Sequence, residues 1–210
     1  LFVPYPKGKK QASLKEKKTG SVRLRSPQWR FSLMLAVIAG IIICFNSIIS
    51  LRVPDIIVDS RMGTATTAGT VLSLMQLTGI VAGVGFASLT HVFKKNLLMI
   101  MCFGFGLALA LIGLSGQLWS LVLGTLLAGF TYSTGVTSIF YHLSEKIPTN
   151  LLNLATSLVL IGCNLGSALS SFFIQLVTPL APSNHLLFVL IGALMLLTGV
   201  FASQLLVRTK

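Results

Sequence analysis

Residues 31–51 read FSLMLAVIAGIIICFNSIISL, and this stretch decides the fold. It contains no charged residue, and it is about as long as the ~20 residues that an α-helix needs to cross the hydrocarbon core of a bilayer. Five further stretches of this kind follow, so we predict six membrane-spanning helices, at Phe31–Leu51, Thr66–Val92, Leu97–Ser115, Leu118–Leu143, Leu151–Val177 and Leu186–Val207. All seven prolines lie outside these spans or at their edges, which favours uninterrupted helices.

The composition requires lipid as the solvent. Of the 210 residues, 54% are hydrophobic and only 10% are charged, whereas a soluble domain usually carries about 25% charged residues. A water-soluble chain of this length could not bury so much apolar surface. The three cysteines lie far apart in apolar stretches, without the spacing of metal ligands, so no metal site and no cofactor is predicted. The fold class that follows is an all-α membrane protein.

The charges predict the orientation. Nine of the 16 Lys and Arg residues lie between Lys7 and Arg30, before the first span, and five more lie in every second connection and after the last span. The other face has only Arg52 and Arg61, which are balanced by two aspartates. Cytoplasmic loops carry the excess of basic residues, so both ends of the bundle are expected in the cytoplasm and the protein in the cell membrane as a multi-pass protein. Because topology accounts for the net charge of +12, no nucleic-acid partner is predicted.

Several short motifs occur in an order that resembles the order in a known protein family. Span one ends in Val53-Pro54-Asp55, span four contains AGFTYSTG at 128–135 and exits through SEKIP at 144–148, and span five contains GCNLG at 162–166. The chain resembles the C-terminal half, helices seven to twelve, of a major facilitator superfamily transporter. The conserved loop motif of that family is degenerate around Gly85–Lys95, where the basic pair remains but the aspartate and the second glycine are missing, so a charge-based gate is not expected there.

The resemblance also divides the chain. Residues 1–30 are interpreted as the end of a preceding helix and a basic cytoplasmic linker, and residues 31–210 as the six-helix transmembrane bundle. The chain begins with Leu1, so we expect it to be a piece of a longer protein. The resemblance implies a secondary active transporter of a small solute that works by alternating access, with an N-terminal six-helix half, a small-molecule substrate and the lipid bilayer as partners.

Polar residues inside the spans suggest where a solute binds. On span five, Asn153, Ser157, Ser171 and Gln175 project within about 20° of Asn164 at 100° per residue. Such amides either tie helices together or line a cavity, and both interpretations stay open. The family places the cavity between spans one, two, four and five, near the midplane. The candidate substrate-binding residues are Asn46, Gln76, Tyr132 and Asn164.

Other functions fit the sequence less well. Gly113-Leu114-Ser115-Gly116 resembles a motif of intramembrane serine proteases, but we expect Ser115 in an outer turn, His142 at the opposite membrane face and His185 in an outer loop, so no enzyme is predicted. No Asp or Glu lies within a span, so a proton carrier would have to lie in the other half. The alternative function is a six-span membrane protein without transport activity: a receptor, an accessory subunit or a degenerate remnant.

Overall fold

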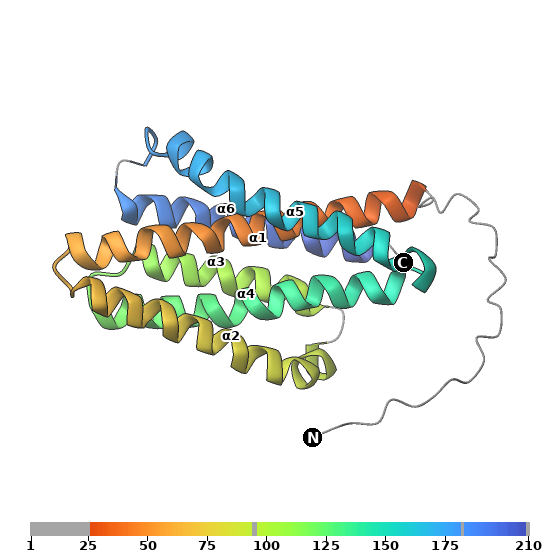
Figure 1. Cartoon of the computed structure of the whole chain (residues 1–210), viewed down its shortest axis with the longest axis horizontal. Coiled ribbons are helices and arrows are strands. Elements are labelled where there is room, and N and C mark those ends of the chain that lie inside the picture. Colours follow the sequence, from red (N-terminus) through yellow and green to blue (C-terminus); the bar gives the residue numbers. More distant parts are fainter. Residues whose placement is uncertain (1–25, 94–95, 182, 209–210) are drawn as a thin grey trace, which may run out of the picture.

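Helices are the only regular secondary structure among the described residues. The computed structural model describes residues 26–93, 96–181 and 183–208. They fold into α1 (Ser26–Asp59), α2 (Ala65–Phe93), α3 (Leu97–Gly113), α4 (Leu118–Lys146), α5 (Thr149–Val177) and α6 (Asn184–Arg208) (Figure 1). Each predicted span is therefore a helix, and the all-α membrane fold is confirmed. Five helices are long and apolar enough to cross a membrane, while α3, with 17 residues, is at the lower limit of about 17 residues.

Helix α1 is longer at both ends than predicted. It continues through Pro54 to Asp59, so the prediction that every proline lies outside or at the edge of a helix is wrong for Pro54. Proline removes only the bond to Ser50 O, and the helix is held beyond it by Val53, Ile56 and Ile57, which are buried on one face.

At its other end, α1 begins at Ser26, so residues 26–30 of the predicted linker are helical. Residues 1–25, which make up the rest of that linker, lie outside the described residues.

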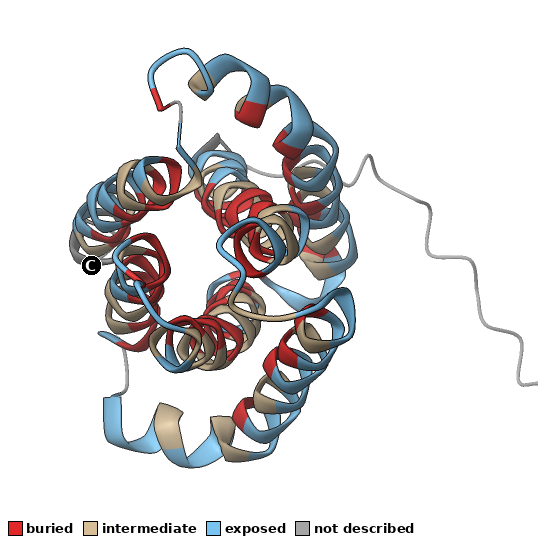
Figure 2. Ribbon diagram, turned by 90° about the vertical axis from the view of Figure 1, so that its left-hand side faces the viewer, coloured by how far each residue is buried: buried red, intermediate tan, exposed pale blue. Residues whose placement is uncertain are grey.

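The helices form two layers. Helix α1 packs against α5 on one side and α4 on the other, and α4 also packs against α2, which gives a row in the order α5, α1, α4, α2. Helices α6 and α3 pack against each other behind this row, as the end-on view shows (Figure 2). The four helices that carry the candidate site residues are thus the four helices of one layer.

Glycines bring the helices of this row close together. At Gly162 and Gly166 of α5, an added Cβ would overlap the backbone carbonyl oxygens of Ala36 and Gly40 in α1. At Gly129 of α4, an added Cβ would likewise overlap a backbone carbonyl of α2. Gly162 and Gly166, four residues apart, thus form a packing face, because small residues let helix backbones approach closely.

A second pair of glycines with a spacing of four residues, Gly79 and Gly83 of α2, behaves differently. An added Cβ at Gly79 would come within 3.5 Å of Ser133 Cβ, whereas Gly83 has nothing within 4 Å. Only Gly79 of this pair therefore lies in a helix contact among the described residues.

Candidate substrate-binding site

Helix α5 has a polar exposed face and a buried face. The exposed polar residues along this face are Asn153, Ser157, Asn164, Ser171 and Gln175, and Thr149, Asn150 and Ser167 are also exposed. The buried face carries Ala155, Val159 and the glycine contact to α1. Asn164 Nδ2 donates to Leu160 O at 2.9 Å, within the same helix. No hydrogen bond joins these exposed amides to another described helix, so they do not hold the described bundle together.

Gln76 lies on the exposed face of α2. Its neighbour Met75 is buried, and Thr78 Oγ1 donates across to Leu126 O of α4 at 3.1 Å. The face of α2 toward α4 is thus occupied by Met75 and Thr78. Gln76 is exposed beside that contact, so its amide is available to whatever covers α2.

Asn46 is half-buried in α1, and its amide oxygen has no partner. Oδ1 is buried and accepts no hydrogen bond from the described residues. The next residue, Ser47, lies with its Oγ 3.3 Å from Ser167 Oγ of α5, which joins the two helices. An unpaired buried acceptor is unfavourable, and a donor on a solute or a water molecule would relieve it. Sequence reasoning missed the Ser47–Ser167 pair because neither hydroxyl lies on the predicted amide row.

Tyr132 is also half-buried. Its ring packs against Phe105 of α3 with the ring centroids 6.4 Å apart. Tyr132 therefore sits between the helices rather than on the open surface of the row. Its body belongs to the packed core, and only part of it is exposed.

The four candidate residues do not enclose a pocket by themselves. Asn46 and Tyr132 lie on the middle helices of the row, and Gln76 and Asn164 on the outer two. None of the four residues lines the groove of ≈ 740 Å³ between α1, α5 and α6 or the groove of ≈ 510 Å³ near Phe86 and Tyr141. A site built from these residues needs a second surface facing the row.

His142 was not among the predicted functional residues. It is buried against its neighbours near the end of α4, its Nδ1 lies 3.7 Å from Glu145 Oε2, and neither ring nitrogen has a hydrogen-bond partner among the described residues. The expectation that any proton carrier lies in the other half overlooked this titratable group. The pattern that indicates the burial of His142 is its spacing of four residues from Ser138, which is buried on the same face of α4.

The serine-protease motif has no catalytic geometry among the described residues. Ser115 is buried and its Oγ donates to Ile112 O at 2.7 Å, while His185 Nδ1 lies 3.0 Å from Gly113 O. His185 lies in the first turn of α6 and not in a loop as predicted. It joins the outer ends of α3 and α6.

The fold and the polar row define a multi-pass helical membrane protein with one layer of helices that exposes amides. The model of one protein family, the Major Facilitator Superfamily, matches residues 35–210. The chain belongs to the Major Facilitator Superfamily, a family of transporters. Neither the curated proteins nor the solved structures contain a match to the chain.

Proposed function

We propose that the chain is the C-terminal half of a secondary active transporter that moves a small solute across the cell membrane by alternating access. The proposal includes an N-terminal half of six helices that faces the α5–α1–α4–α2 row and rocks against it. The solute then binds between the halves, in contact with Asn46, Gln76, Tyr132 and Asn164.

The observation that carries this proposal is the exposed row of amides and hydroxyls along α5. Polar side chains facing hydrocarbon are unfavourable, so helices that expose them face protein or a water-filled cavity. Both α5 and α6 expose large apolar residues, such as Phe172 and Phe201. Helix α6, however, has no amide side chain between Leu186 and Ser203. The polar face of α5 thus marks the side of the bundle that lipid does not cover.

The test is substitution of Asn164 by leucine in the full-length transporter. Asn164 is exposed and its described hydrogen bond stays within α5, so Asn164→Leu should fold normally while solute binding and transport are lost. A site that is built to hydrogen-bond its ligand loses affinity steeply when one of the two polar partners is removed. Gln76→Leu should behave in the same way, and Tyr132→Phe should be milder because only the hydroxyl is lost.

The matched control is Ser170→Leu on the same helix. Ser170 is buried on the face with the glycines, so this variant should impair folding rather than solute affinity. The measurement is solute binding and transport by purified, folded variants, with a solute identified from a panel of small molecules. Normal transport by Asn164→Leu, or its failure to fold, would refute the site. No transport of any solute by the intact protein would favour the alternative of a membrane protein without transport activity.

A further inference from the structure

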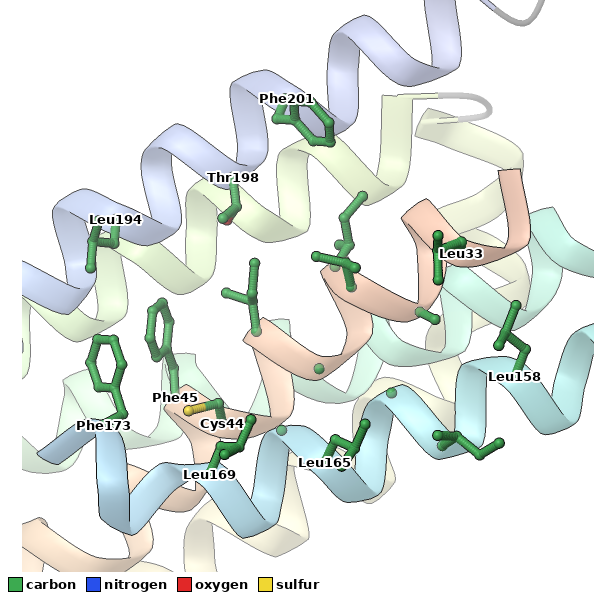
Figure 3. A pocket seen from close by; sticks show the side chains of 18 of the residues that line it. Leu33, Cys44, Phe45, Leu158, Leu165, Leu169, Phe173, Leu194, Thr198 and Phe201 are labelled. Carbon is green, nitrogen blue, oxygen red and sulfur yellow. The ribbon is translucent and has the colours of Figure 1, made fainter. Parts of the chain in front are cut away.

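The groove of ≈ 740 Å³ lies on a different side of the bundle from the candidate solute site. It runs between α5 and α6, with α1 as its floor (Figure 3). From the structure we infer that this groove binds one acyl chain of an anionic phospholipid, taken from the membrane leaflet on the basic side of the protein.

The groove exists because α1 and α6 pack loosely. Helices α3 and α4 approach closely through glycines: an added Cβ at Gly104 would lie 2.8 Å from Thr131 Cγ2. The glycines of α6 contact α3 and not α1, and the space between α1 and α6 is lined by larger side chains such as Phe45, Leu194 and Phe201. The α1–α6 pair therefore stays apart, and the space between them opens beside α5.

The chemistry of the lining selects a hydrocarbon chain. Apart from the Cys44 thiol, the only polar side chain in the lining is Thr198, and its hydroxyl donates to Met195 O at 2.7 Å within α6. A polar solute would find no side-chain hydrogen bond there. Acyl chains are the apolar molecules that surround the protein, and a chain that lies in the groove gains dispersion contacts along its lining.

The dimensions fit one leaflet. The groove extends along α1 from Leu33 to Phe45, a rise of about 18 Å at ~1.5 Å per residue, compared with about 15 Å for half of the hydrocarbon core. At the inner end, Phe45 and Phe173 close it with ring centroids 5.6 Å apart.

The open end of the groove carries the features of a headgroup region. Trp29 and Arg30 are exposed one turn before Leu33, on the side of the helix that leads into the groove. Tryptophan is enriched at the membrane–water interface, and basic residues there attract anionic headgroups. These residues place a negatively charged headgroup at the mouth and its chain along Leu33–Phe45.

The test is photo-crosslinking of the full-length protein in nanodiscs. The probes are phosphatidylglycerol and phosphatidylcholine with a diazirine in one acyl chain, and the labelled peptides are identified by mass spectrometry. We expect phosphatidylglycerol to label the groove segments of α1, α5 and α6 several-fold above exposed apolar residues elsewhere, such as Leu107 of α3. Arg30→Gln should remove the preference for phosphatidylglycerol over phosphatidylcholine and leave basal labelling.

Two matched variants separate groove binding from general lipid contact. Val37 lines the groove and Val200 is exposed on α6 outside it. Val37→Trp should reduce labelling of the groove several-fold and Val200→Trp should not, with both variants eluting as folded protein. Labelling spread evenly over the surface, or a folded Val37→Trp with unchanged labelling, would overturn the proposal. Absence of labelling from the groove would overturn the proposal as well.

Discussion

At the scale of single residues, the bundle contains three kinds of hydroxyl. Most serines and threonines donate to a carbonyl of their own helix, as Thr125 does to Leu121 O at 2.8 Å. Ser133 instead donates across to Gly79 O of α2 at 2.9 Å and so joins two helices. Ser32 and Ser138 have buried hydroxyl oxygens without a partner among the described residues. An unpaired buried polar atom is unfavourable, so removing either of these two hydroxyls should not lower the stability of the protein as removing a paired hydroxyl does.

Replacing Ser138 by alanine should leave stability unchanged or increase it, because the alanine removes an unpaired hydroxyl. The matched change Ser133→Ala on the same helix should destabilise by about 0.6 kcal/mol, the average for a hydrogen bond between membrane helices. Unfolding of the two variants in mixed micelles measures both effects. A larger loss for Ser138→Ala than for Ser133→Ala would mean that the Ser138 hydroxyl has a partner, such as bound water.

At the scale of helices, the faces that pack together follow from periodicity and glycine spacing, whereas the positions of the helix ends do not. The packing role of Gly162 and Gly166 follows from their spacing of four residues, and the structure places both against α1. The extension of α1 past Pro54 could not be predicted from local sequence, because proline disfavours a helix interior and only the burial of Ile56 and Ile57 outweighs it. The GxxxG pattern at Gly79 looked equivalent, but whether a neighbour lies opposite Gly83 depends on the tilt of α2.

Gly166→Ala should push α1 and α5 apart, because the added methyl group overlaps the carbonyl oxygen of Gly40. Overpacking of this kind costs about 1–3 kcal/mol, so the melting temperature of the purified protein should fall. Gly83→Ala is the control, since an added Cβ there has nothing within 4 Å and alanine favours a helix over glycine by up to about 1 kcal/mol. Equal melting temperatures for Gly166→Ala and the unchanged protein would contradict the close contact.

At the scale of the whole molecule, the two layers differ in the amides that they expose. The row α5–α1–α4–α2 carries the exposed amides on α5 and the amide of Gln76 on α2, beside exposed apolar residues such as Leu77, while the exposed residues of α3 are apolar, as Leu107 is. The sequence predicted six spans and the polar row from hydropathy and 100° periodicity. It could not predict that Tyr132 packs on Phe105, or that Asn46 Oδ1 is buried without a partner, because both depend on how neighbouring helices meet.

Labelling of a cysteine at position 164 with a membrane-impermeant thiol reagent tests the central claim most directly, because it needs no known solute. The background is the full-length protein with Cys44, Cys102 and Cys163 replaced by alanine. If the polar face of α5 lines a water-filled cavity, Asn164→Cys should react and Leu107→Cys, on the exposed apolar face of α3, should not. Reaction at 107 with none at 164, in protein shown to be folded, would contradict a solute cavity along α5.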